Sequence, residues 1–230
     1  GYDVAPGCPA LVVANGPSLD QAVEFLREAH DRAVIFTCGT ALGSMTKAGI
    51  KPHFHVEQER PRSMAEWIAY ASDEQDRAGI TLLALNTTHP DVFEQFERGG
   101  MGLKFRDAGT SFLEQTGASE EAAVQLTECN PTVLNAAFSF VKELGFTEVY
   151  LIGADLGFPA GDKHHSELSL YYDLKEGAEE TVYVQTRPAD ALVVPGNFGT
   201  DVETSSAFLR SRESLEAALA KCPDVRCYNT

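Results

Sequence analysis

The sequence predicts an α/β fold in which helices cover both faces of a mostly parallel β-sheet. Short apolar runs rich in β-branched residues recur along the chain, and turn-forming residues bound each of them, as expected of buried strands. Segments with apolar residues at helical spacing alternate with these runs. Because parallel neighbours need crossover connections, this alternation favours a doubly wound, Rossmann-like sheet.

The first unit sets the pattern. Its strand is expected over 10–14, and its helix begins near Leu19. The turn over 15–18 reads Asn-Gly-Pro-Ser, in which the proline suits a first helical turn, and Ser18 or Asp20 can cap or complement the helix.

The later elements follow the same design. We expect strands at 33–38, 53–57, 80–85, 102–105 and 148–152, and helices at 41–48, 62–71, 90–98 and 133–144. Residues 110–126 lack a clean period and are interpreted as a loop with one or two helical turns. In the last third of the chain we expect an acidic loop at 175–180, strands at 181–186, 191–195 and 225–229, and a helix at 207–220. We find no repeat beyond the βα unit and no domain linker, so 1–230 is expected to form a single domain.

Composition and charge exclude several classes of protein. The 230 residues carry a formal net charge of −16, which argues against binding to nucleic acid or to anionic membranes. We recognise neither an apolar run long enough to span a bilayer nor a signal peptide. The five cysteines are scattered and odd in number, which fits a reducing cytoplasm rather than a disulfide framework. Because the chain begins at Gly1, we expect a fragment of a longer protein; its oligomeric state stays open.

Several strand ends are candidate ligand sites, because parallel strands deliver side chains to the ligand edge of the sheet at their carboxyl ends. The first turn combines free backbone N–H groups with a helix N-terminus, which attracts phosphate; an ordinary strand-to-helix connection is the competing interpretation. For Glu57, the competing interpretation is a solvated turn. The candidates are Asn15, Gly16, Pro17 and Ser18 in the first turn, Gly39 and Thr40 in the second, and Glu57 after the third strand.

The start of the helix at 133–144 is a further candidate. Thr132 and Asn135 bring a hydroxyl and an amide to a positive helix end, and these groups suit a base, a ribose or a phosphate. A buried helix needs such a cap in any case, so capping is the competing interpretation.

A polar segment follows the strand at 148–152. The strand ends in Gly153 and Asp155, and the chain then reaches His164 and His165 and, shortly after, two tyrosines, Tyr171 and Tyr172. Histidine is the usual general base near neutral pH, and tyrosine hydroxyls can stabilise a departing phosphate without a metal. Lys163 can meet phosphate charge. The alternative is a zinc site, for which the third ligand would come from Asp155, Asp162 or Glu167.

Five groups of residues carry a resemblance to a known family. They are Asn15-Gly16-Pro17-Ser18-Leu19-Asp20, Gly49-Ile50-Lys51-Pro52-His53-Phe54, Pro131-Thr132-Val133-Leu134-Asn135, Gly153-Ala154-Asp155-Leu156-Gly157-Phe158 with His164-His165-Ser166, and Tyr228-Asn229-Thr230. In this order they resemble the motility accessory factor (Maf) proteins of the MptE-like superfamily, formerly grouped as a domain of unknown function. The chain looks like the central catalytic domain of these multidomain proteins.

The resemblance implies a sialyltransferase-like fold and a metal-independent glycosyltransferase without a cofactor. Such an enzyme moves a nonulosonic acid, pseudaminic or legionaminic acid, from its CMP-activated form to Ser or Thr of flagellin, which flagellum assembly and motility need. Asn15, Gly16 and Ser18 would then face the phosphate and ribose of CMP, Thr132 and Asn135 would hold the cytidine with Glu57 as a further candidate, His165 or His164 would be the base, and Tyr171 and Tyr172 would stabilise the leaving group. Pro17, Gly39, Thr40, Gly153 and Asp155 complete the expected donor site.

Two alternatives remain open within the same superfamily. One is a 6-hydroxymethylpterin diphosphokinase, which moves pyrophosphate from ATP and needs Mg²⁺ held by carboxylates. The carboxylates available for it are Asp155, Asp162, Glu57 and Glu59. The other is a non-catalytic flagellin-binding chaperone that retains the first loop without using it.

Overall fold

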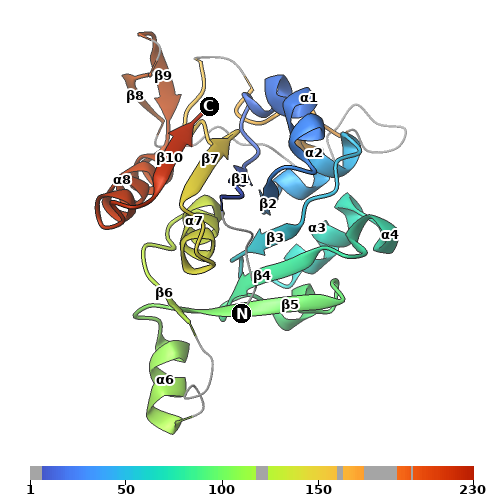
Figure 1. Cartoon of the computed structure of the whole chain (residues 1–230), viewed down its shortest axis with the longest axis vertical. Coiled ribbons are helices and arrows are strands. Elements are labelled where there is room, and N and C mark those ends of the chain that lie inside the picture. The colour runs from blue at the N-terminus through green and yellow to red at the C-terminus, as the bar shows by residue number, and fades with distance from the viewer. Residues whose placement is uncertain (1–6, 118–123, 160–162, 174–190, 198) are drawn as a thin grey trace.

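The centre of the molecule is an eight-stranded parallel sheet in the order β10-β7-β1-β2-β3-β4-β5-β6 (Figure 1). The structure, a computed structural model, describes residues 7–117, 124–159, 163–173, 191–197 and 199–230. The strands of the sheet are β1 (Ala10–Val13), β2 (Val34–Cys38), β3 (Phe54–Glu57), β4 (Thr81–Leu85), β5 (Arg98–Lys104), β6 (Gln125–Leu126), β7 (Glu148–Ile152) and β10 (Arg226–Asn229). The predicted α/β, Rossmann-like fold class is confirmed.

Helices cover both faces of this sheet (Figure 1). Helices α1 (Leu19–Ala29), α2 (Ala41–Lys47), α3 (Ser63–Ala71) and α5 (Pro90–Phe93) pack on one face, and α7 (Val133–Glu143) and α8 (Ser206–Ala220) pack on the other. Shorter or peripheral elements are α4 (Glu74–Arg77), α6 (Ala108–Thr116) and the 3₁₀ turn η1 (Leu170–Tyr172). None of the described helices combines the length and the apolar character needed to cross a membrane.

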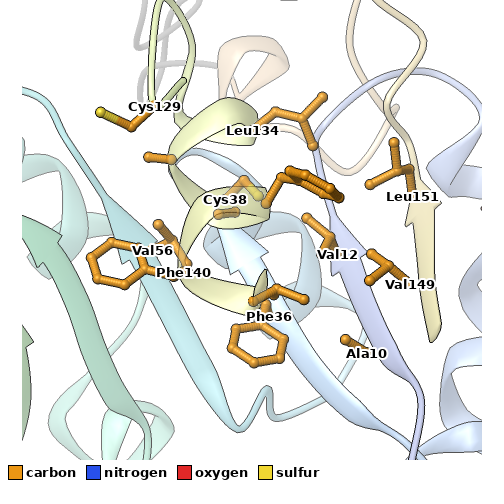
Figure 2. Packing of buried hydrophobic residues seen from close by; sticks show 14 of the residues in the cluster. Ala10, Val12, Phe36, Cys38, Val56, Cys129, Leu134, Phe140, Val149 and Leu151 are labelled. Carbon is orange, nitrogen blue, oxygen red and sulfur yellow. The ribbon is translucent and has the colours of Figure 1, made fainter. Parts of the chain in front are cut away.

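Helix α7 is more deeply buried than α8, the other helix on its face of the sheet. Figure 2 shows its side chains, including Leu134 and Phe140, among residues of the central strands such as Val12, Phe36 and Val56. Eight consecutive residues of α7, from Leu134 to Val141, are buried. Because burial of one large apolar side chain contributes about 1.5–3 kcal/mol, this contact fixes the position of the helix on the sheet.

The strand order places a topological switch point beside β1. From β1 the chain builds outward through β2 to β6, and it then returns to add β7 on the other side of β1. The carboxyl ends of β1 and β7 therefore lie side by side at this switch point. Ligands of doubly wound folds bind at such a switch point.

Two sequence-based predictions at the β5 edge were wrong in detail. The helix expected at 90–98 ends at Phe93, and Arg98 already pairs with Thr81 as the first residue of β5. Strand β5 begins with Arg98-Gly99-Gly100, a run without the apolar alternation that marks a strand. The helical turns expected within 110–126 are confirmed as part of α6, which begins two residues earlier, is capped by Asp107 and ends at Gly117 with a φ of 71°.

The strand predicted at 191–195 is confirmed as the first strand of a hairpin, whose second strand the sequence analysis did not predict. Strands β8 (Leu192–Pro195) and β9 (Asp201–Thr204) pair antiparallel in a sheet of their own, and Glu203 of β9 bridges to Phe158. The helix predicted at 207–220 and the strand at 225–229 are confirmed within one residue at each end. The acidic loop at 175–180 and the strand at 181–186 lie outside the described residues.

Candidate functional site

A pocket lies at the switch point, where the predictions from the sequence converge. It is bordered by the ends of β1, β2 and β7, by the start of α7 and by the segment after β7. Of the predicted site residues it is lined by Asn15, Gly16, Thr40, Thr132, Gly153, Asp155, His164 and His165. The predicted residues that do not line it are Pro17, Ser18, Gly39, Glu57, Asn135, Tyr171 and Tyr172.

A backbone hydrogen bond and close packing join the first turn to the end of β7. The Gly16 N–H donates to the Gly153 carbonyl at 2.8 Å, and a Cβ on Gly16 would lie 2.5 Å from that oxygen. Gly153 in turn has a φ of 65°, a left-handed conformation that glycine adopts at little cost. The two glycines therefore let the strand ends meet beneath the pocket.

The N-terminus of α1 already has a carboxylate partner. The Ser18 N–H donates to Asp155 Oδ2 at 3.0 Å. Ser18 occupies the N-cap position, but its own hydroxyl makes no capping hydrogen bond. Asp155 of the neighbouring loop therefore does the capping that the sequence assigned to Ser18 or Asp20.

Both polar atoms of the Asn15 side chain make hydrogen bonds to other protein groups. Its Nδ2 donates to Thr40 Oγ1 and to Ser169 Oγ, both at 3.0 Å. Its Oδ1 accepts from Ser44 Oγ at 2.6 Å. The side chain is only 6% exposed, so it connects the end of β1 to α2 and to the segment that contains the histidines.

His165 is held in one tautomer by the main chain of the first turn. Its Nδ1 lies 3.2 Å from the carbonyl oxygen of Asn15, which can only accept, so Nδ1 carries the hydrogen and Nε2 presents a lone pair. Burial, with a smaller contribution from His164, lowers the pKa of His165 to about 4. The ring is therefore neutral, as a general base must be, throughout the physiological pH range.

Both tyrosines contact His165. The Tyr171 ring stacks on the His165 ring with centroids 4.6 Å apart and 9° between the planes. The Tyr172 hydroxyl accepts from the His165 backbone N–H at 3.3 Å, and Lys163 Nζ lies 4.9 Å from the centre of the Tyr172 ring. His164 contacts His165 and the Phe158 ring, with centroids 4.4 and 5.3 Å apart respectively.

Glu57 is fully buried at the end of β3, next to an equally buried histidine. Its Oε1 accepts from the N–H groups of Gln58 and Glu59 at 2.7 and 3.0 Å. Its Oε2 lies 3.9 Å from His55 Nε2, and neither atom has a hydrogen-bond partner among the described residues. Burial raises the pKa of Glu57 to about 7 and lowers that of His55 to about 3.

The start of α7 forms a closed polar network with α8. Asn135 Oδ1 accepts from the Thr132 N–H and from the hydroxyls of Thr132 and Ser211, at 2.8–3.1 Å. Asn135 Nδ2 donates to the Ser211 carbonyl at 2.9 Å. Asn135 is fully buried, so its amide caps α7 and joins it to α8, whereas Thr132 reaches the pocket.

Comparisons with known proteins agree with this architecture. A family model described as 6-hydroxymethylpterin diphosphokinase MptE-like matches residues 3–161. The chain belongs to the MptE-like family. Among solved structures, the MptE-like chain is similar to the Maf glycosyltransferase from Magnetospirillum magneticum AMB-1, with a TM-score of 0.76 and 27% identity over 99% of the chain. It spans 32% of that protein's length. No curated protein matches the chain.

The diphosphokinase description implies a Mg²⁺ site, and the described carboxylates of the MptE-like chain do not fit one. Asp155 accepts from Ser18, and Glu57 folds back onto the loop that follows it. Within the described ranges, no group of three or more His, Cys, Asp or Glu residues is placed to hold a metal ion. The zinc alternative at His164 and His165 meets the same difficulty, and its possible ligand Asp162 lies outside the described residues.

Sequence reasoning missed several pocket residues of the MptE-like chain. Phe208 comes from α8, where it looked like an ordinary member of an apolar helical stripe. Leu156 has a φ of 49°, unusual for a branched residue, and its carbonyl accepts from Thr204 Oγ1 at 2.6 Å. The available signal was the Gly-Ala-Asp-Leu-Gly motif. The other missed residues are Ala14, Cys38, Val133, Leu134, Ala154 and Gly157.

Proposed function

We propose that the chain is the catalytic domain of a cytoplasmic glycosyltransferase that uses a CMP-activated nonulosonic acid, pseudaminic or legionaminic acid, to modify Ser or Thr of flagellin. The likeness to the Maf glycosyltransferase and the order of the shared motifs support this proposal. Because the chain corresponds to about a third of that protein, the acceptor protein can dock on other domains.

The observation that carries the proposal is the state of His165 in the pocket. Its Nε2 lone pair is available, because Nδ1 donates to Asn15. In the transfer step, the acceptor hydroxyl oxygen bonds to the anomeric carbon of the sugar while the bond from that carbon to the phosphate oxygen breaks. The hydroxyl proton passes to His165 Nε2, and CMP leaves with the bonding electron pair.

The pocket supplies two kinds of surface for the donor. Thr40 and Thr132 bring hydroxyl groups to its rim, which suits the ribose and phosphate of a nucleotide. Apolar side chains, among them Val133, Leu156 and Phe208, form much of the remaining wall. A cleft of this kind, mostly apolar with a few polar groups, is typical of small-molecule sites. Asn15 and Asn135 contribute through the shape of the site, because protein partners occupy their side chains.

The proposed transfer needs no metal. Two features support this part: Asp155 and Glu57 each accept backbone N–H groups of the protein, and a histidine base and tyrosine hydroxyls stand close together. The tyrosines reach a leaving group only if the segment that carries them moves toward the pocket, since neither lines it in this structure.

Mass spectrometry of flagellin tests the proposal. The chain is incubated with flagellin and with CMP-pseudaminic or CMP-legionaminic acid, and we expect flagellin to gain the mass of one sugar per modified hydroxyl as CMP is released. The variant H165A is the control and should give neither product. Absence of CMP release from both donors, with and without flagellin, would contradict the proposed reaction.

The description of the family model favours a second candidate, pyrophosphate transfer from ATP to a hydroxymethylpterin. This reaction would require ATP together with Mg²⁺ and would produce AMP. A chain that consumed ATP in this way and ignored CMP would make the diphosphokinase the correct assignment. A chain that bound flagellin but neither nucleotide would be a chaperone.

A further inference from the structure

Hydrogen bonds join the first turn and the start of α1 to residues 165–169, which we call the histidine segment. Asp20, in the first turn of α1, accepts from Ser166 Oγ with one carboxylate oxygen and from the Glu167 N–H at 2.9 Å with the other. Ser166 is fully buried, and its hydroxyl also accepts from the Leu168 N–H at 3.2 Å. One carboxylate therefore fixes the two residues that follow the histidines.

Asn15 binds the same segment from the other side. Its carbonyl accepts from the Ser166 N–H at 2.9 Å and from His165 Nδ1 at 3.2 Å. Its side chain donates to Ser169 Oγ. Main-chain and side-chain atoms of one residue thus contact three positions of the histidine segment, about 150 residues further along the chain.

The charges at the start of α1 oppose a second role as a phosphate cradle. The Ser18 N–H is taken by the Asp155 carboxylate, and the Gly16 N–H is taken by the Gly153 carbonyl. Asp20 adds a second carboxylate to the first helical turn. A phosphate placed here would meet two negative charges, and it would find these two amides already bonded.

We propose that Asn15 and Asp20 are positioning residues that hold the His165 ring at the pocket in its Nδ1–H tautomer, and that the first turn serves the base rather than the donor phosphate. This inference rests on the proposed function for the role of His165 as the base. The hydrogen bonds that carry it do not depend on the substrate.

The test follows the His165 ring by ¹⁵N NMR and the reaction by kinetics in D20A. In the wild type we expect the Nδ1–H tautomer and a neutral ring down to about pH 5. In D20A we expect a mixture of tautomers and a titration midpoint at least one pH unit higher, because the released segment gains solvent. The rate constant for transfer should fall at least tenfold, while the Kd for CMP changes less than twofold.

Two further variants and a control sharpen the test. D20N keeps an oxygen for the Ser166 hydroxyl but presents an amide to the Glu167 N–H, so its tautomer mixture and rate should lie between those of the wild type and D20A. S166A removes the same link from the other side, and it replaces D20A in the test if D20A does not fold. E28Q changes an exposed carboxylate on the same helix and should behave as the wild type.

The outcomes separate the inference from the proposed function. A folded D20A or S166A with unchanged tautomer and titration would overturn the positioning role. A tenfold loss of CMP affinity in D20A with an unchanged His165 ring would make Asp20 a donor-binding residue instead. If the wild type transfers no sugar but the ring still responds to D20A, the inference about position stands and the proposed reaction fails.

Discussion

The imidazole Nδ1 of His165 lies 3.2 Å from the carbonyl oxygen of Asn15, although the two residues are 150 positions apart in the chain. This hydrogen bond joins the first strand-to-helix turn to the segment after β7 across the switch point of the sheet. It decides which ring nitrogen is free, and so it gives the proposed base both its location and its tautomer.

Replacing His165 should separate catalysis from binding. We expect H165A to lower sugar transfer by at least 10²-fold, the lower end of the usual contribution of a general base, and to leave CMP affinity within about twofold. H164A removes the neighbouring ring, which contacts His165 and Phe158 but is not the proposed base, and it should cost less. Rate measurements and calorimetric titration with CMP check both variants. A joint loss of CMP binding and activity in H165A would mean that the residue binds the donor or supports the fold.

The rate of transfer should not show the fall below about pH 6.5 that protonation of an ordinary histidine base causes. An ordinary histidine with a pKa near 6.5 loses its basic form as the pH falls below 6.5, whereas burial keeps His165 neutral down to about 4. The rate should therefore stay level between pH 8 and about 5, once the spontaneous hydrolysis of the donor is subtracted. A tenfold fall in rate between pH 6.5 and 5.5 with the chain still folded would show that the base titrates normally.

Glu57 should make the protein less stable as the pH rises through the range from 4.5 to 7. Its pKa is 4.5 when unfolded and about 7 when folded, so the unfolded chain releases this proton first. The shift corresponds to a loss of about 3 kcal/mol by pH 8, and almost none of the loss is present below pH 4.5. E57Q keeps an oxygen for the two loop N–H groups and should raise the free energy of unfolding at pH 8 but not at pH 4. Equal effects of E57Q at both values would contradict this assignment.

Gly16 should tolerate no side chain. A Cβ there would lie 2.1 Å from Asp155 Oδ2 and 2.5 Å from the Gly153 carbonyl, and the second contact is with the backbone. G16A is expected to cost about 1–3 kcal/mol of stability in urea unfolding. The double variant G16A/D155A removes only the first contact and should not recover the loss. G79A, whose Cβ meets nothing within 4 Å, should show only the conformational cost of a positive φ, about 1 kcal/mol.

Most of the sheet could be predicted because its strands carry their own signal. Runs such as 10–13 and 82–85 are apolar without interruption, as expected of strands buried on both faces. Only the end of β5 was predicted, because its first residues, Arg98-Gly99-Gly100, have neither alternation nor β-branched side chains; pairing with β4 places them in the sheet. In the β8–β9 hairpin the first strand was predicted, whereas Asp201–Thr204 lacks an apolar run and is a strand through its pairing with β8.

The site could be predicted as a set of strand ends but not as a set of contacts. The carboxyl ends of β1, β2 and β7 gathered as the parallel topology requires. What sequence spacing cannot show is which polar group another side chain has already engaged. Asn15 and Asn135 have the chemistry of ligand-binding residues, yet Ser44, Ser169 and Ser211 hold them within the protein.

The most direct test of the account is calorimetric titration of the whole chain with CMP and, separately, with ATP, each with Mg²⁺ and with EDTA. We predict that CMP binds with the same affinity in Mg²⁺ and in EDTA, and that ATP binds more weakly than CMP in both. Binding of ATP that requires Mg²⁺, without binding of CMP, would contradict the glycosyltransferase and favour pyrophosphate transfer.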